Sequence, residues 1–278
     1  MSEDRIHRTV SDDGTELAGR IRGDGPPLVL VHGACADETE WDAAVPLLAE
    51  RFTCYTMNTR CRGRSGYSDD LSPERLVEDV TAFADSIDAP VRLAGVSGGG
   101  MYALGAAARA ESVTAVATWE PPVFEVVPEE FATSFQGVLE RMGEQYAAGE
   151  HVDGVRTFLS FVGNDHEMAA LEAAGELAYA SRYLPVDLQE IEQALTAEDT
   201  SPTDPAVLAT VSAPVLVLHG TASRLGSWFR TGAEFAAEHL PNARVQAVPG
   251  VGHLSCQVTP EPIMRELGDF FASTPAPA

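Results

Sequence analysis

Short apolar runs alternate with helical periodicity along most of the chain. The runs are bounded by Gly, Pro and Asp, as buried strands are, and the segments between them repeat apolar residues every three or four positions. The predicted strands are 27–31, 52–57, 91–96, 113–119, 214–218 and 244–248. The predicted helices are 40–51, 72–87, 98–109, 228–239 and 260–271. This alternation predicts an α/β fold with a mostly parallel, doubly wound sheet, preceded by a hairpin of strands 6–10 and 16–21.

The regular order breaks between Pro121 and Asp204. Strand signals disappear there, and aromatic and aliphatic residues recur at helical spacing. We interpret this stretch as a helical cap, residues 121–205, inserted into a core made of residues 1–120 and 206–278.

Charge and composition narrow the possible partners. The 278 residues are 45% apolar and 22% charged, which is typical of a folded globular protein, and the net charge is −24. Such a surface repels phosphate backbones and anionic lipid headgroups, so neither nucleic acid nor a membrane is an expected partner. All 18 basic residues are arginine. The missing lysine suits a salt-rich cytoplasm, and biased codon usage is an alternative explanation.

The expected location is the cytoplasm. The first ten residues are polar and charged, without the apolar core of an export signal, and no apolar run reaches the roughly 18 residues of a membrane span. The four cysteines, Cys35, Cys54, Cys61 and Cys256, are too scattered for a disulfide framework and lack zinc-site spacing. We therefore expect reduced thiols and no metal.

A candidate nucleophile stands in the motif Gly95-Val96-Ser97-Gly98-Gly99. The motif lies between a predicted strand and a predicted helix, and this context makes G-x-S-x-G informative. A sharp turn there strains the serine backbone, requires glycine beside it and presents the Ser97 hydroxyl at the carboxyl edge of the sheet. The alternative is a glycine-rich turn that only packs tightly or binds a phosphate.

With this motif the chain resembles the α/β-hydrolase family over nearly its whole length. His32-Gly33-Ala34 is similar to the family's oxyanion segment, and the stretch 58–66 looks like a diverged D-x-R-G-x-G-x-S-G loop, with Asn58 for Asp and Cys61 for Gly. The resemblance implies an α/β-hydrolase fold with an inserted helical cap. Acyl transfer needs two donors for the oxyanion, and we assign the amides of Ala34 and Gly98 to that role.

His253 is the predicted general base among seven histidines. It ends Pro249-Gly250-Val251-Gly252-His253, directly after the last predicted strand, where a flexible loop can bring an imidazole to the serine. The resembled family carries its catalytic histidine in such a segment. His32 and His219 each close a strand and are interpreted as structural.

The third member of the triad departs from the common pattern of the family. Most members place an aspartate after the strand 214–218, where this chain has Ser223, and no acidic residue occurs from 220 to 233. Glu120, at the end of the strand after the nucleophile, is the leading candidate, because a minority of the family places its acid there. A solvated residue at the cap hinge is the alternative for Glu120, and the loop of Ser223 is the rival site.

These residues predict a cofactor-independent serine hydrolase that cleaves a carboxylic ester or lactone of a hydrophobic small molecule through an acyl-enzyme on Ser97. Trp41, Phe124 and Tyr183 are the expected substrate-binding residues. Haloalkane dehalogenases and epoxide hydrolases share the fold but use an aspartate nucleophile, so Ser97 argues against both. The second hypothesis is a ligand-binding member of the fold without turnover, motivated by the missing aspartate. The sequence does not determine the oligomeric state.

Overall fold

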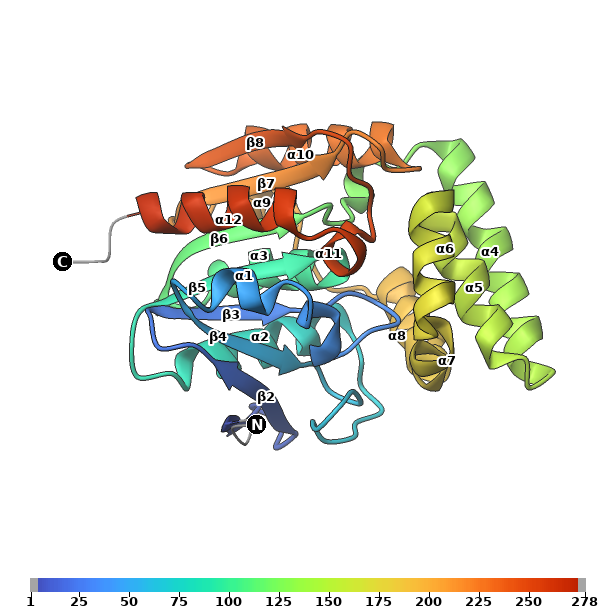
Figure 1. Cartoon of the computed structure of the whole chain (residues 1–278), viewed down its shortest axis with the longest axis horizontal. Coiled ribbons are helices and arrows are strands. Elements are labelled where there is room, and N and C mark those ends of the chain that lie inside the picture. The colour runs from blue at the N-terminus through green and yellow to red at the C-terminus, as the bar shows by residue number, and fades with distance from the viewer. Residues whose placement is uncertain (1–4, 275–278) are drawn as a thin grey trace.

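A computed structural model describes residues 5–274 of the chain, and an eight-stranded sheet forms its centre (Figure 1). The strands lie in the order β1-β2-β4-β3-β5-β6-β7-β8. Their bounds are β1 Arg5–Val10, β2 Glu16–Arg22, β3 Pro27–Val31, β4 Thr53–Asn58, β5 Val91–Val96, β6 Val113–Trp119, β7 Val215–Gly220 and β8 Ala243–Val248. The predicted α/β sheet is confirmed, and each predicted strand corresponds to one of these.

The loops that follow the parallel strands β3 to β8 all lie at the carboxyl edge of the sheet. β1 and β2 form the predicted hairpin, β2 pairs antiparallel with β4, and the other neighbours are parallel. In parallel strands the carboxyl ends meet at the same edge of the sheet, where ligands bind in open α/β folds. Val96 of β5 pairs with Trp119 of β6, so Ser97 and Glu120, which follow them, start side by side.

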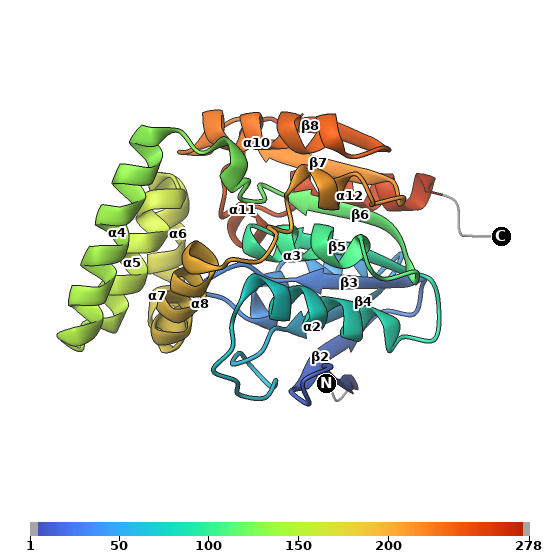
Figure 2. The ribbon, with the colours of Figure 1, turned by 180° about the vertical axis from the view of Figure 1, so that it is seen from behind.

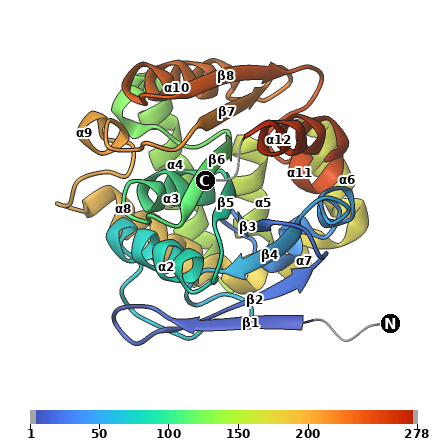
Figure 3. The same ribbon diagram turned by 90° about the vertical axis from the view of Figure 1, so that its left-hand side faces the viewer.

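Helices cover both faces of the sheet (Figure 3). One face carries α2 (Pro73–Asp85), α3 (Gly98–Ala107) and α10 (Gly226–His239), and the other carries α1 (Val45–Leu48) and α12 (Glu261–Ser273). Alternation along β3 explains the two layers, because successive side chains of a strand point to opposite faces. Val29 and Val31 pack in the first layer, and Leu28 and Leu30 pack in the second.

A helical insertion lies between β6 and β7, at the carboxyl edge of the sheet (Figures 1 and 2). It contains η2 (Phe124–Val126), α4 (Glu129–Ala147), α5 (His151–Val162), α6 (Asp165–Ala174), α7 (Glu176–Ala180), η3 (Ser181–Tyr183) and α8 (Leu184–Thr196), followed by α9 (Pro205–Leu208). Its apolar cluster includes Cys35 and Leu254 from the core loops, so the insertion is packed onto the sheet edge. No helix within residues 5–274 is both long enough and apolar enough to cross a bilayer.

The continuous helix predicted for residues 40–51 is wrong. The chain forms a short 3₁₀-helix, η1 (Glu38–Trp41), and then α1, which begins at Val45. Pro46 explains the break, because proline is compatible with the first turn of a helix but lacks the amide hydrogen that an interior position needs. The break leaves Glu38 and Glu40 in a tight turn, where both side chains are buried.

Candidate active site

Ser97 lies on a strained turn between β5 and α3. Its φ of 51° and ψ of −126° are unusual for a residue with a side chain. The flanking glycines are required by space, since a Cβ on Gly95 would stand 2.3 Å from the Gly99 oxygen, and one on Gly99 would stand 2.3 Å from the His32 oxygen. The Ser97 amide donates to the Trp119 oxygen at 2.9 Å, which fixes the turn against β6.

His253 lies in the loop between β8 and α11 (Ser255–Val258) and is almost fully buried. Its ring stacks on Phe229, with the ring centres 4.7 Å apart and the planes 3° from parallel. Its carbonyl oxygen accepts a hydrogen bond from Trp119 Nε1 at 2.9 Å. On the other side of the loop, Ser255 Oγ accepts from the Gly252 amide and donates to Glu167 Oε1. The loop therefore holds the imidazole in one orientation.

Glu120 is fully buried and contacts His253 directly. Its Oε2 lies 2.8 Å from His253 Nδ1, within the 3.2 Å expected for a carboxylate that orients this imidazole. The other oxygen, Oε1, accepts from the Gly220 amide at 2.8 Å and from Ser223 Oγ at 2.5 Å. Ser223 and Glu120, rivals in the sequence, are thus partners in the structure. The interpretation of Glu120 as a solvated hinge residue is excluded by its burial.

The amides of Ala34 and Gly98 lie beside Ser97. Ala34 lines the cavity from the loop after β3, and Gly98 lines it from the first turn of α3. Within residues 5–274, neither amide donates a hydrogen bond to another protein group. Both are therefore available to a substrate oxygen, and the N-terminus of α3 adds a favourable dipole for a developing negative charge.

His32 is interpreted as structural from the sequence, and its surroundings agree. Its Nε2 accepts from the Thr59 amide at 3.1 Å, and Nδ1 lies 2.8 Å from the Gly33 oxygen. Burial, and secondarily the charge of Arg62, lower the pKa of His32 to about 4, so the ring is neutral at pH 7. It fastens the loop after β3 to the loop after β4.

Contacts with Glu38 explain why this chain has Asn58 where the resembled family has aspartate. Its Nδ2 donates to Glu38 Oε2 at 2.9 Å and its Oδ1 accepts from the Glu38 amide. An aspartate here would place a second carboxylate against the buried carboxylate of Glu38. Cys61, where the family has glycine, adopts the left-handed φ of 63° that explains the family's preference.

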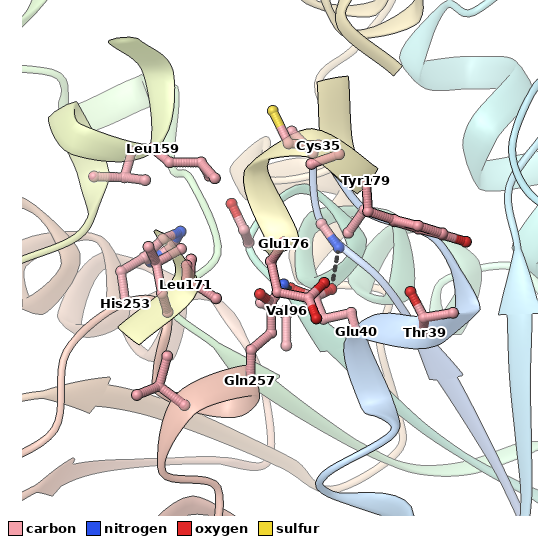
Figure 4. A pocket seen from close by; sticks show the side chains of 18 of the residues that line it. Cys35, Thr39, Glu40, Val96, Leu159, Leu171, Glu176, Tyr179, His253 and Gln257 are labelled. Atoms are coloured by element: carbon pink, nitrogen blue, oxygen red, sulfur yellow. Dashed lines mark hydrogen bonds between the residues drawn. The ribbon is translucent and has the colours of Figure 1, made fainter. Parts of the chain in front are cut away.

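Two cavities meet at Ser97 and His253. The first, of about 340 Å³, is lined by polar side chains from η1, α7 and α11 together with apolar residues of α5 and α6, and we call it the polar lobe. Figure 4 shows Glu40, Thr39 and Tyr179 on one side of it and His253 and Leu159 on the other. The second, of about 90 Å³, we call the aromatic lobe, and its aromatic lining is Tyr102, Phe124, Phe131, Phe135, Phe158, Phe161, Trp228 and Phe229.

Of the three expected substrate-binding residues, only Phe124 lines a lobe. Trp41 packs in the core layer that helices α1 and α12 cover. Tyr183 is held away from the cavity because its hydroxyl donates to Asp37 Oδ2 at 2.6 Å. Neither Trp41 nor Tyr183 is therefore placed to meet a ligand in these lobes. Aromatic side chains of α4 and α5 line the cavity instead, and their helical spacing is the sequence signal for them. Nothing local in the sequence marks Glu40 as a cavity residue.

Glu40 is a buried carboxyl group on the wall of the polar lobe. Its Oε2 accepts from the Gly33 amide at 2.7 Å and its Oε1 from Gln257 Nε2 at 3.1 Å. Burial raises the pKa of Glu40 to about 7, against the opposing effects of these hydrogen bonds and of His253. The nearby Asp37 adds to the rise. Within residues 5–274, no group of three or more His, Cys, Asp and Glu side chains could hold a metal ion.

Replacing Glu40 with glutamine is expected to change how stability depends on pH. A carboxyl whose pKa is raised from 4.5 to about 7 on folding binds more protons in the folded state between these values, so its contribution to stability falls as pH rises through that window. Glu40→Gln removes this loss. The free energy of unfolding of the variant, relative to wild type, should therefore gain about 2 to 3 kcal/mol between pH 5 and pH 8. Denaturant titrations at the two pH values measure the difference, and equal differences would contradict the assignment.

Known proteins resemble the chain in sequence and in fold. Residues 28–266 match the model of the alpha/beta hydrolase family. A pimeloyl-acyl-carrier-protein methyl ester esterase from Stenotrophomonas maltophilia is 34% identical over 174 residues, 55% of this chain and 66% of that protein, slightly under two thirds of its length. The esterase of the same name from Nitrosomonas europaea is 26% identical over 86% of this chain and 93% of its own. An alpha/beta hydrolase structure from Sphaerobacter thermophilus superposes with a TM-score of 0.73 at 29% identity, over 95% of this chain and all of that one.

Proposed function

Since this enzyme belongs to the alpha/beta hydrolase family, we propose that it is a cofactor-independent serine hydrolase that cleaves a carboxylic ester or lactone of a hydrophobic small molecule. The observation that carries the proposal is the contact of Glu120 Oε2 with His253 Nδ1, beside a cavity that Ser97 also lines. The names of the Stenotrophomonas and Nitrosomonas relatives support ester cleavage.

The proposed reaction begins with attack of Ser97 Oγ on the carbonyl carbon. Glu120 holds Nδ1 of His253, which leaves Nε2 to take the serine proton, and the carboxylate stabilises the imidazolium that forms. The amides of Ala34 and Gly98 bind the oxyanion. His253 then gives its proton to the leaving alcohol, and the acyl group remains on Ser97. A water molecule, deprotonated by the same imidazole, then attacks the acyl carbon, the imidazolium returns the proton to Ser97 Oγ, and the carboxylic acid is released.

The two lobes support a substrate with two unlike parts. The aromatic lobe suits an apolar group, since its lining is almost wholly carbon, whereas the polar lobe offers Glu40 and Gln257 to a polar group. We propose that residues 121–205 act as the cap that closes these lobes, because α4 and α5 supply much of the aromatic wall. In an ester, cleavage would separate the apolar part from the polar part. In a lactone, the two parts belong to one ring and stay joined after the ring opens.

Charge and cysteine chemistry support a proposal about location and partners. All four cysteines are free, and the net charge is −24. We propose a cytoplasmic enzyme that acts on a dissolved small molecule and binds neither nucleic acid nor membrane.

Labelling with a fluorophosphonate tests the mechanism directly. An activated serine forms a covalent adduct, so we expect one label per chain, located on Ser97 by mass spectrometry and abolished in Ser97→Ala. A panel of p-nitrophenyl esters, lactones and thioesters then ranks the substrate classes. A chain that stays unlabelled and binds small molecules without turnover would support the second hypothesis, a ligand-binding member of the fold.

The charge of the polar lobe predicts a charge preference among substrates. Glu40, Asp42 and Glu176 line it, and no arginine lines either lobe in the described part of the chain. Esters of matched size that carry a carboxylate should therefore have a kcat/KM at least about tenfold below their neutral or trimethylammonium counterparts. Glu176→Gln should narrow the difference, and so should added salt. Equal kcat/KM across the three charges would contradict the prediction.

A further inference from the structure

Three consecutive amides follow β3, and the outer two are held by buried carboxylates. The Gly33 amide donates to Glu40 Oε2 at 2.7 Å, and the Cys35 amide donates to Asp187 Oδ1 at 2.9 Å. The middle amide, that of Ala34, is the one left for the substrate oxygen. Its direction is set by the two peptide planes beside it, because each peptide unit is rigid. Fixing the neighbours therefore fixes Ala34.

Asp187 reaches this loop from the helical insertion. It lies in the first turn of α8, 152 positions further along the chain than Cys35, and it is fully buried. Oδ1 also accepts from Arg62 Nη2 at 2.6 Å, so one carboxylate oxygen bonds both the Cys35 amide and Arg62.

Arg62 fastens the same loop from a second side. Its Nη1 donates to the Ala36 oxygen at 3.3 Å, and its Nη2 also contacts Glu190 Oε2 at 2.7 Å. A buried arginine between two carboxylates resists displacement, because moving either partner would leave a buried charge unpaired. The network thus ties α8, the loop after β4 and residues 33–36, the proposed oxyanion loop, into one unit.

The backbone at Cys35 needs such a constraint. Its φ of 58° lies in the left-handed region, which residues with a side chain rarely adopt. A strained conformation persists only where surrounding contacts hold it. The hydrogen bond from the Cys35 amide to Asp187 is a contact at the strained residue itself, and it comes from outside the loop.

We propose that Asp187 is a positioning residue for the reaction: by holding the Cys35 amide it aims the Ala34 amide at the substrate oxygen, so that the helical insertion completes the oxyanion hole. The inference rests on the proposed serine hydrolase mechanism. It assigns the insertion a part in the chemical step, in addition to its contribution to the walls of the lobes. Asp187 does not touch the substrate, since it lines neither lobe.

The test compares Asp187→Ala with a control on the same helix. Misplacing one oxyanion donor costs about 10²-fold in kcat or more, so Asp187→Ala should lose about 10²-fold in kcat while KM changes by less than about threefold. Gln193, two turns further along α8, also anchors the helix to the core, through the Leu71 amide and the Asp69 oxygen. Gln193→Ala should keep kcat within about twofold, because it loosens α8 without touching the oxyanion loop.

A thionoester separates positioning from simple anchoring. Sulfur is a weak hydrogen-bond acceptor, so a C=S substrate gains less from the oxyanion amides than its C=O counterpart. The ratio of kcat for the ester to kcat for the thionoester should fall about tenfold in Asp187→Ala and stay at the wild-type value in Gln193→Ala. A residue that only fastened the helix would lower the melting temperature and leave this ratio unchanged.

Asp187→Leu decides the matter if the alanine variant does not fold. Leucine is close to aspartate in size but cannot accept from the Cys35 amide, and Arg62 keeps its contact with Glu190, so kcat should fall about 10²-fold and the ester to thionoester ratio should fall with it. A folded Asp187→Leu with wild-type kcat and ratio would overturn the inference while wild-type ester hydrolysis leaves the proposed function standing. If the wild type hydrolyses no ester and Ser97 takes no label, the proposed function fails instead, and the inference falls with it.

Discussion

Ser97→Ala is expected to lower kcat for ester hydrolysis by about 10⁵- to 10⁶-fold, and His253→Ala by a similar factor. The two groups act as one unit, so removing either removes nearly the whole advantage of covalent catalysis. Alanine fits the strained turn as well as serine does, since both carry a Cβ at the φ of 51°, and the fold should be intact.

Circular dichroism and melting temperature provide the control for both variants. The double variant Ser97→Ala/His253→Ala should be no slower than either single variant, because the losses are not additive. If Ser97→Ala is folded and retains kcat within tenfold of wild type, Ser97 is not the nucleophile.

Glu120→Gln is expected to lower kcat by about 10³- to 10⁴-fold. Glutamine keeps the shape of the side chain but removes the charge that, in the proposed mechanism, stabilises the imidazolium and fixes the tautomer of His253. The variant should fold, since an amide can still accept from the Gly220 amide. Full activity in a folded Glu120→Gln protein would remove this residue from the mechanism.

Ser223 provides the matched comparison. Its hydroxyl donates to Glu120 Oε1 at 2.5 Å, so Ser223→Ala removes one hydrogen bond from the carboxylate and leaves the charge in place. We expect a loss of kcat within about tenfold, the size of one hydrogen bond. Ser223→Asp should partly restore the activity of Glu120→Gln, because it returns a carboxylate to the vicinity of His253. A Ser223→Ala loss as large as that of Glu120→Gln would make the loop, and not the strand end, the source of the orienting group.

The sequence predicted those parts of the site that depend on neighbouring residues. Ser97 stands out because the glycines that its turn requires are adjacent to it, and His253 because its loop directly follows the last strand. Glu120 required one further step, the inference that its strand lies beside that of Ser97. The register of Val96 with Trp119 shows why that step succeeds, since parallel pairing carries the two strand ends to the same level.

The parts of the site that the sequence does not reveal depend on contacts between distant segments. Packing under the sheet decides where Trp41 lies, and a hydrogen bond to Asp37 decides where Tyr183 lies. Glu40 and Asp187 have no sequence signal, because a carboxylate that holds a backbone amide has no local pattern. The prediction of a continuous helix over 40–51 fails for a local reason, because Pro46 allows a helix to begin there but not to continue through that position.

The hydrogen bond between Ser223 and Glu120 has a consequence for how such sites evolve. It shows that the loop after β7 contacts the carboxyl group that the end of β6 places beside His253, so in the proposed mechanism either element could carry the acid. A sequence with carboxylates at both positions would hold a single proton between them, where the hydroxyl proton of Ser223 now lies, because two adjacent carboxylates do not both ionise. In the proposed mechanism such a sequence would keep a carboxylate beside His253. The acid could then pass from one strand end to the next by single substitutions.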